Sequence, residues 1–217
     1  MALAIFDLDN TLIADDSDYL WGQFLVDKEV VDGEFYEREN LRFYDEYKAG
    51  TLDIFEFLNF SLKPLAENTI EQLQIWRKEF FNQLIEPVLL PKAMNIVEQH
   101  KNSGDHVMII TATNSFVTRP IADAYGIETL IATEPEWDGS RYTGGVSGTP
   151  CFQMGKVERL NLWLDEQNQT MDGSYFYSDS HNDLPLLERV THPVVVDADE
   201  KLTKIATERN WQQLSFR

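Results

Sequence analysis

The sequence predicts an α/β fold, a doubly wound parallel sheet that is interrupted by an inserted helical domain. From about residue 91 onward, short and continuously apolar runs alternate with amphipathic segments, a pattern typical of buried parallel strands joined by helices. One further apolar run, residues 2–6, stands alone near the N-terminus and predicts another strand. Between these two parts lies a long stretch with helical spacing. We therefore expect a core of residues 1–13 and 88–217 and a helical insert of residues 14–87.

The insert contains four segments whose apolar residues recur at helical spacing. The first segment begins at Ser17 or Asp18, and the second runs from Glu34 to Lys48. The third runs from Thr51 to Pro64, and the fourth from the capping-box pattern at Asn68 to Pro87. Their apolar stripes are rich in aromatic side chains. This composition predicts a separate aromatic core for the insert.

The remaining elements alternate along the second part of the chain. Strands are expected at residues 107–111, 130–133, 175–178 and 194–196. Helices are expected at residues 92–101, from Asn114 or Ser115 to Tyr125, at 154–167 and at 200–209. Residues 137–146 predict a hairpin with Asp138-Gly139 at its turn.

Composition and charge exclude several classes of function. A hydrophobic fraction of 43% with 25% charged residues is typical of a globular protein. The formal net charge of -19 disfavours binding to nucleic acid and to anionic membranes, because both need a basic surface. No apolar run approaches the roughly 20 residues that span a bilayer. The single cysteine, Cys151, rules out an intramolecular disulfide, and we expect a cytoplasmic protein.

Two carboxylates follow the first strand directly. Asp7 and Asp9 stand at positions i and i+2, so both side chains point to the same side of an extended segment. Two acids held together repel each other unless they share a cation or divide into a nucleophile and a proton carrier. The pair therefore predicts a catalytic or metal site at the end of the strand.

Three more polar groups occur where strands or loops reach the same edge of the sheet. Thr111 ends an apolar strand, and Ala112 follows it at a helix start, where free N–H groups favour anions. Lys156 begins a helix, which is the unfavourable end of the helix dipole for a structural lysine. Asp179 and Asp183 follow the strand at 175–178. Together with the first pair, these residues predict one site for an anion and a cation at this edge of the sheet.

This set of residues resembles the four-motif signature of the haloacid dehalogenase superfamily. The matching residues are Asp7-Leu8-Asp9-Asn10-Thr11, then Thr111, then Lys156, then Ser178-Asp179 with Asp183. Their order and spacing match over the whole chain, and the helical insert after the first motif resembles the C1 cap of phosphoserine-phosphatase-like members of subfamily I. Ser178 and Ser180 stand where many members carry glycine. The resemblance implies a Rossmann-like core with an inserted cap.

The resemblance also implies a role for each motif residue. Asp7 is expected to attack phosphorus, and Asp9 to protonate the leaving group and then activate water. Mg²⁺ is expected to be held by Asp7, the backbone carbonyl of Asp9, Asp179 and Asp183, the last either directly or through water. The phosphoryl oxygens are expected to be bound by Thr111, Ala112, Lys156 and Asn182.

Reaction type and substrate follow in part. Asp9 disfavours dehalogenation, since a halide leaves without a proton, and favours hydrolysis of a phosphate monoester. A phosphotransferase or phosphomutase is the alternative within the superfamily, and a non-catalytic binding protein is the alternative outside enzymes. A capped site suits a small metabolite.

The resemblance further suggests an amine-bearing ester, either histidinol phosphate or phosphoserine. Asp16 aligns with an acid that binds the substrate amine, and Arg42 is the candidate for binding a substrate carboxylate. Tyr19, Trp21 and Tyr44 are candidates for stacking on an imidazole. The oligomeric state is left open.

Overall fold

The computed structural model describes residues 2–217. Seven strands form one sheet in the order β4-β3-β2-β1-β5-β6-β7. All neighbours pair in parallel except β3 and β4, which form an antiparallel hairpin at one edge. The strands are β1 (Leu3–Phe6), β2 (His106–Asn114), β3 (Thr129–Trp137), β4 (Tyr142–Ser147), β5 (Tyr175–Ser178), β6 (His192–Val196) and β7 (Gln212–Leu214).

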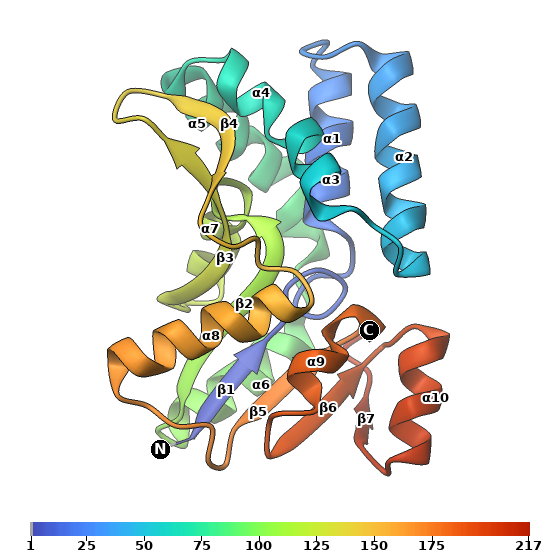
Figure 1. Ribbon diagram of the computed structural model, residues 1–217, viewed down its shortest axis with the longest axis vertical. Coiled ribbons are helices and arrows are strands. Elements are labelled where there is room, and N and C mark those ends of the chain that lie inside the picture. Colours follow the sequence, from blue (N-terminus) through green and yellow to red (C-terminus); the bar gives the residue numbers. More distant parts are fainter. Residues whose placement is uncertain (1) are drawn as a thin grey trace.

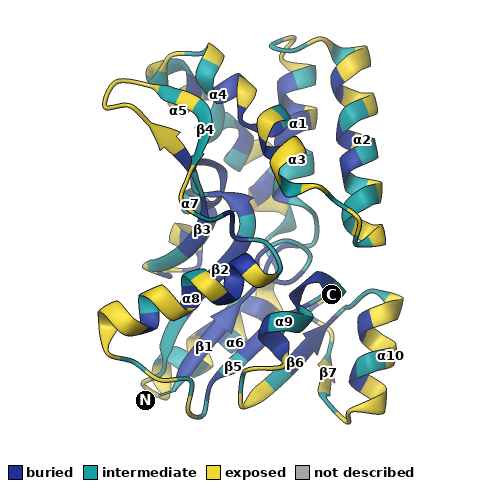
Figure 2. Ribbon diagram, in the orientation of Figure 1, coloured by how far each residue is buried: buried dark blue, intermediate teal, exposed yellow. Residues whose placement is uncertain are grey.

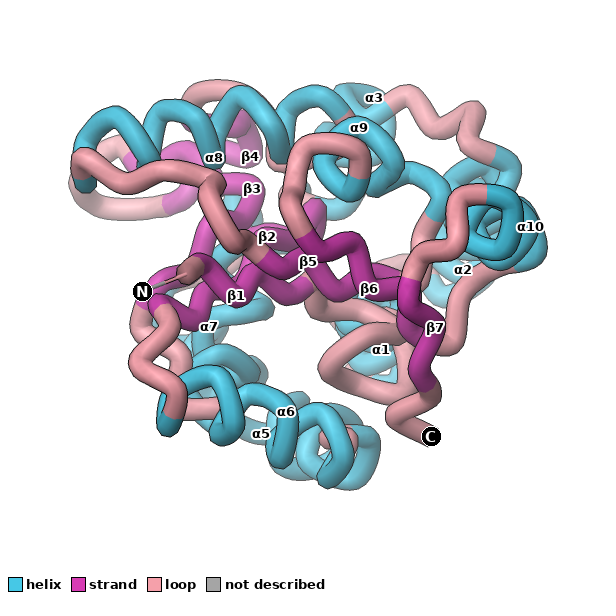
Figure 3. Tube along the Cα trace, turned by 90° about the horizontal axis from the view of Figure 1, so that it is seen from below, coloured by secondary structure: helices cyan, strands magenta, loops and turns pink. Residues whose placement is uncertain are grey.

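Helices cover both faces of this sheet, as Figure 3 shows for α8 and α9 on one face and α6 and α7 on the other. The helices of the core are α6 (Pro91–Asn102), α7 (Ser115–Ala124), α8 (Met154–Gln167), η3 (His181–Asp183), α9 (Leu184–Leu187) and α10 (Glu200–Glu208). Alternate residues of β1 supply the two apolar clusters: Ala4 and Phe6 join one, Leu3 and Ile5 the other. The predicted doubly wound sheet is confirmed.

The helical insert follows β1 and lies beyond the carboxyl ends of the strands (Figure 1). Its helices are α1 (Ser17–Asp27), α2 (Gly33–Ala49), α3 (Ile54–Ser61), α4 (Lys63–Glu67) and α5 (Ile70–Phe80), continued by a π-helical turn η1 (Phe81–Ile85) and a 3₁₀ turn η2 (Glu86–Val88). The chain leaves and re-enters the core side by side, because Ile13 bridges Leu89 and the Ala14 N–H donates to the Val88 carbonyl. The domain limits at residues 13/14 and 87/88 stay a prediction.

Burial follows this layering. Figure 2 shows buried residues along the central strands and exposed residues on the outer sides of α2, α8 and α10. The aromatic side chains of the insert pack together, with the ring centroids of Trp21 and Phe80 5.1 Å apart. They do not form the separate core that was expected, because Trp21 also packs edge to face on Phe116 of α7 and both belong to the same apolar cluster as Phe6 of β1. No helix in the described part of the chain is long and apolar enough to cross a membrane.

The structure corrects some local predictions. Pro64, expected to end a helix, lies in the first turn of α4, where the missing proline N–H breaks no intrahelical bond. Asp16, rather than Ser17 or Asp18, caps α1, since its carboxylate accepts from the Asp18 and Tyr19 N–H groups. The short α9 and the three-residue β7 were not expected, because elements of that length carry too little periodicity to be recognised.

Candidate active site

The sheet order brings the motif residues to one edge. Strands β2, β1 and β5 are neighbours, and they carry or directly precede Thr111, Asp7 and Asp179, respectively. Lys156 reaches the same place from the first turn of α8. The carboxyl ends of parallel strands therefore assemble the site from segments far apart in the sequence.

A buried lysine joins two of the aspartates. The Lys156 ammonium lies 2.8 Å from Asp7 Oδ1 and 2.7 Å from Asp183 Oδ1, and the three residues are only 2–4% exposed. Ser178 Oγ donates a second hydrogen bond to Asp183, at 2.7 Å. Burial alone would lower the pKa of Lys156, but the carboxylates of Asp183 and Asp7 outweigh it and raise that pKa. Lys156 is therefore a permanent cation.

The pKa of Asp7 is raised above its ordinary value. Burial raises the pKa of Asp7 to about 7, and the neighbouring Asp183 carboxylate adds to this rise, while Lys156 opposes it. The carboxylate of Asp7 lines an internal pocket whose floor also contains Thr111 and Ala112. Asp7 and Lys156 are buried but both line the pocket, so a ligand in the pocket contacts this ion pair directly.

The backbone before α8 is constrained so that Lys156 points inward. Gln153 has a positive φ of 48°, and Gly155 packs so closely that a Cβ there would lie 2.0 Å from the Pro150 carbonyl oxygen. Only glycine fits this approach. The glycine next to Lys156 is therefore a structural condition for the site.

Asp9 is held differently from Asp7. Its Oδ1 accepts from the Ser17 N–H at 2.6 Å, and its Oδ2 accepts from Thr113 Oγ1 at 2.8 Å. Burial raises the pKa of Asp9 to about 7, and the charge of Asp16 contributes, while the hydrogen bonds from Ser17 and Thr113 oppose the rise. Thr113 was missed by the sequence reasoning, although it lies two residues beyond Thr111 in a strand and so shares its face.

The donor set fits a hard cation that keeps water ligands. In residues 2–217, no three acidic, histidine or cysteine side chains converge closely enough to hold a metal by themselves. The expected metal ligands include fewer side chains, namely Asp7 and Asp179 together with the backbone carbonyl of Asp9. Mg²⁺ usually keeps several water ligands, so this number is sufficient. Burial raises the pKa of Asp179 and the Asp7 and Asp183 carboxylates add to it, so the cluster has more negative charge than Lys156 offsets. The residues present fit a divalent cation.

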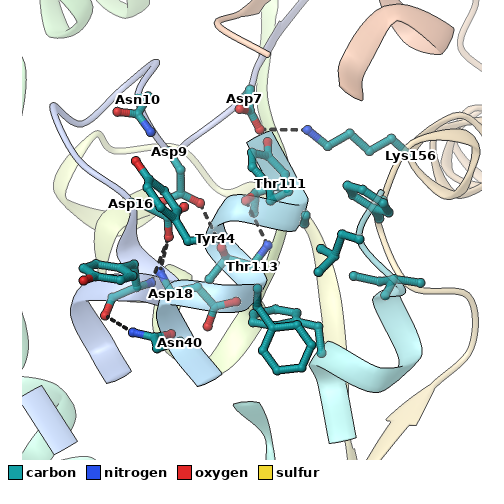
Figure 4. Close-up of a pocket in the computed structure, with 18 residues that line it drawn as sticks. Asp7, Asp9, Asn10, Asp16, Asp18, Asn40, Tyr44, Thr111, Thr113 and Lys156 are labelled. Carbon is teal, nitrogen blue, oxygen red and sulfur yellow. Dashed lines mark hydrogen bonds and ion pairs between the residues drawn. The ribbon is translucent and has the colours of Figure 1, made fainter. Parts of the chain in front are cut away.

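The insert closes the pocket from the other side (Figure 4). The start of α1 contributes Asp16, Asp18 and Tyr19, and α2 contributes a stripe at positions 40, 43, 44 and 47. Asp16 is half-buried; burial raises its pKa to about 6, and Asp15 adds to this while the N–H groups that it caps oppose it. The wall is acidic and aromatic.

Three predicted residues lie elsewhere. Arg42 does not line the pocket, and its guanidinium makes ion pairs with Glu39 and Glu46 of α2 and with Glu56 of α3. Its helical position explains this, since residue 42 falls outside the stripe at 40, 43, 44 and 47.

Asn182, expected to bind phosphate, is engaged between the two domains. Its Nδ2 donates to the Tyr47 carbonyl at 2.9 Å, and its Oδ1 accepts from Gln153 Nε2 at 3.0 Å. Trp21 is 1% exposed and packs in the core, so it does not face the pocket, whereas Tyr19 and Tyr44 do.

Comparison with known proteins matches residues 4–188 to the haloacid dehalogenase-like hydrolase family. This chain belongs to that family. The expected membership is confirmed, and the cap-bearing fold agrees with the inserted helices.

Individual relatives of this family extend the comparison. The chain is 45% identical to a histidinol-phosphatase of Neisseria meningitidis serogroup C (strain 8013), over 99% of both chains. A crystal structure of a protein of unknown function from Bordetella pertussis Tohama I matches with a TM-score of 0.93 and 42% identity, covering 100% of this chain and 99% of that one.

A substrate-bound phosphoserine phosphatase complex matches with a TM-score of 0.72 at 16% identity, over 100% of this chain and 93% of that one, and this likeness shows the fold. As a member of the haloacid dehalogenase-like family with these relatives, the chain is a phosphatase, the expected enzyme class.

Proposed function

We propose that this phosphatase is a Mg²⁺-dependent phosphomonoesterase that works through an aspartyl-phosphate on Asp7 and acts on histidinol phosphate. The observation that carries the proposal is the unequal environment of two carboxylates at one pocket. Asp7 is paired with the Lys156 cation, whereas Asp9 accepts hydrogen bonds from Ser17 and Thr113. Such a division suits a nucleophile and a proton carrier.

Asp7 is the nucleophile in this proposal. A carboxylate oxygen of Asp7 forms a bond to phosphorus as the bond from phosphorus to the ester oxygen breaks. Lys156 keeps positive charge beside Asp7 and the phosphoryl oxygens. Thr111 and the Ala112 N–H stand at the same pocket floor and are the proposed additional contacts to phosphate.

Asp9 is the general acid and base. It protonates the departing alkoxide and afterwards takes a proton from the water that attacks the aspartyl-phosphate. A pKa raised by burial to about 7 suits a carboxyl that must give and take a proton near neutral pH. The hydrogen bonds to Ser17 N and Thr113 Oγ1 fix its orientation.

Mg²⁺ would be bound by Asp7, the Asp9 carbonyl and Asp179, with Asp183 as a direct or water-mediated ligand. It supplies positive charge that favours ionised carboxylates and stabilises the charge on the transferring phosphoryl group. Thr11 Oγ1 donates to Asp179 Oδ1 at 3.3 Å and so helps to orient that carboxylate. Asn182 remains a proposed phosphate ligand whose amide first has to leave Gln153 or Tyr47.

The pocket wall favours histidinol phosphate over phosphoserine. Among the described residues that line the pocket, Lys156 is the single lysine or arginine, and two carboxylates already bind it. A substrate carboxylate would find no cation there, because Arg42 lies outside. The half-buried Asp16 is the proposed partner of a substrate amine. The name of the 45% identical Neisseria relative supports the same choice.

Burst kinetics test the mechanism. Phosphate and alcohol release are measured with Mg²⁺ from histidinol phosphate, phosphoserine and p-nitrophenyl phosphate. Asp7→Asn is expected to abolish all turnover. Asp9→Asn is expected to slow the hydrolysis of histidinol phosphate by about 10²–10⁴-fold. The same variant is expected to release one equivalent of nitrophenol rapidly from p-nitrophenyl phosphate, because that leaving group needs no proton.

The outcomes separate the alternatives. Slow nitrophenol release without a burst from Asp9→Asn would contradict the aspartyl-phosphate route with Asp9 as acid. Phosphate that appears on a second alcohol instead of in water would favour a phosphotransferase. Phosphoserine hydrolysed faster than histidinol phosphate would overturn the substrate assignment.

A further inference from the structure

One end of the active-site pocket has no role in the mechanism above. Figure 4 shows Asp7 and Lys156 at one end of the pocket, Asp16 further along, and Asp18 with Asn40 at the far end. The half-buried Asp18 carboxylate makes no hydrogen bond or ion pair with any residue that the structure describes. The Asp18 carboxyl group therefore lacks a partner among the described residues, and burial, with Asp16 and Asp9 adding to it, raises its pKa well above the ordinary value.

Asn40 adds a second unused acceptor. This residue is only 7% exposed, and its Nδ2 donates to the Tyr19 carbonyl at 3.1 Å. That bond fixes the amide, and no described group donates to its Oδ1 although it lines the pocket. The Oδ1 atom is not among the enclosed, unpaired side-chain atoms of the described residues, so it is open to the pocket, where an N–H group of a ligand can donate to it.

Aromatic rings complete this end of the pocket. The Tyr19 and Tyr44 rings have centroids 5.2 Å apart, and both residues line the pocket. Lys48 lies 4.0 Å over the Tyr44 ring but lines a neighbouring groove and not this pocket. The far end thus offers a carboxylate, an amide oxygen and ring faces, and it suits a flat group rich in N–H donors.

We propose that Asp18 and Asn40 form the subsite that binds the imidazole of histidinol phosphate through its ring N–H groups. The inference rests on the proposed function and deepens it. The order of groups along the substrate is phosphate, amine, imidazole, and the order along the pocket is Asp7, Asp16, Asp18. Asp18 accepts a charge-assisted hydrogen bond from the ring, and Asn40 Oδ1 accepts from the other nitrogen when the ring is protonated.

Substrate preference tests the subsite. The Mg²⁺-loaded enzyme is assayed on histidinol phosphate and on phosphoethanolamine, which has the amine without the ring. Asp18→Asn is expected to lower the ratio of kcat/KM values for these two esters by about 10- to 100-fold, the range of a lost hydrogen bond to a charged group. The loss is expected mainly in KM.

Two variants serve as references. Asp27→Asn changes the charge at the exposed far end of α1 and is expected to leave the ratio unchanged. Asp16→Asn is expected to slow the hydrolysis of both esters, because both carry the amine. An unchanged ratio in Asp18→Asn, together with a wild-type melting temperature, would overturn the subsite.

Binding without turnover separates this inference from the proposed function. Calorimetry with histidinol and with ethanolamine requires no phosphatase step. Tighter binding of histidinol by the wild type, lost in Asp18→Asn, supports the subsite even if no ester is hydrolysed. Equal binding of the two alcohols by the wild type contradicts the subsite even if histidinol phosphate is a substrate.

Discussion

The aspartates of the site share one side-chain chemistry and differ only in their surroundings. Asp7 and Asp183 share the Lys156 ammonium, whereas Asp9 accepts from an N–H and a hydroxyl. Asp18 has no described partner. Burial raises the pKa of Asp7 and of Asp9 alike to about 7, so the partners of each side chain, and not the pKa, divide the carboxylates into ion-pair, proton-transfer and ligand-binding groups.

Gly155 tests how strictly the position of Lys156 is set. A Cβ at residue 155 would lie 2.0 Å from the Pro150 carbonyl oxygen, so the backbone before α8 has to move. Gly155→Ala is therefore expected to lower the free energy of unfolding by about 1–3 kcal/mol, as overpacking does, and to lower kcat/KM. Urea unfolding and steady-state kinetics measure the two effects.

Gly33→Ala is the matched control for this substitution. Its Cβ would lie 3.4 Å from Val26 Cγ1, an ordinary contact, in the first turn of α2. It is expected to keep full activity and to gain up to about 1 kcal/mol of stability from the better helix propensity of alanine. Equal free energies of unfolding of the two alanine variants would show that the close approach at Gly155 does not determine the stability of the protein.

At the level of whole elements, the C-terminus of α2 is one of the contacts that join the insert to the edge of the site. The Tyr47 carbonyl accepts from Asn182 Nδ2, and the Ala49 carbonyl accepts from Lys201 Nζ, each at 2.9 Å. The last carbonyls of a helix have no partner within the helix. The Gly50 N–H of the cap donates to the Tyr47 carbonyl at 3.0 Å, and the donors from the core add to this bond. The same helix carries the pocket stripe that includes Asn40 and Tyr44.

Gly50, which caps α2, offers a test of this junction. Its φ is 78°, and a Cβ would lie 2.8 Å from His181 Nε2, whose ring is held by Asp199. Gly50→Ala is expected to destabilise the protein through both the backbone strain, about 1–2 kcal/mol, and the contact with His181. Loss of the docked geometry of α2 is expected to raise KM as well.

Gly104→Ala separates strain from contact. Gly104 has nearly the same φ, 79°, and nothing lies within 4 Å of its added Cβ. It is expected to lose only the strain component and to keep the wild-type KM. If the two alanine variants unfold at the same urea concentration and have the same KM, the junction with His181 is unimportant.

For the molecule as a whole, acidity is both a surface property and a property of the site. The formal net charge is -19, and several carboxylates gather around one buried lysine. Burial raises the pKa of Asp179, with Asp7 and Asp183 adding to the rise, so ionising this cluster costs free energy in the folded state. A cation that binds the folded protein relieves that cost.

Metal removal is expected to lower stability as well as to stop turnover. Adding Mg²⁺ to the chelator-treated protein is expected to raise the free energy of unfolding by about 2.7 kcal/mol at a concentration of 100 times Kd. Thermal melting in Mg²⁺ is compared with melting in NaCl of equal ionic strength. Asp179→Asn is expected to lose most of the Mg²⁺ effect; identical melting of the wild type in both salts would contradict the metal site.

The sequence predicted the elements whose signals are local and strong. The apolar strands before Asp7 and Asp179 and the helix 154–167 agree with the structure. A strand buried on both faces gives a continuous apolar run and a helix gives apolar residues at helical spacing, and both patterns can be recognised in consecutive residues. A helical stripe at 40, 43, 44 and 47 was also readable, and it would have placed Arg42 outside the pocket.

By itself, the sequence determined the fold class, the chain order of the motif residues and their meeting at one sheet edge, since parallel strands end on the same side. Only the tertiary structure decided which partner each side chain has: Thr113 on Asp9, Asn182 between Gln153 and Tyr47, and Asp18 facing the pocket without a partner. These contacts join residues from separate elements, and their geometry depends on how the insert docks on the core. Local periodicity contains no information about that docking.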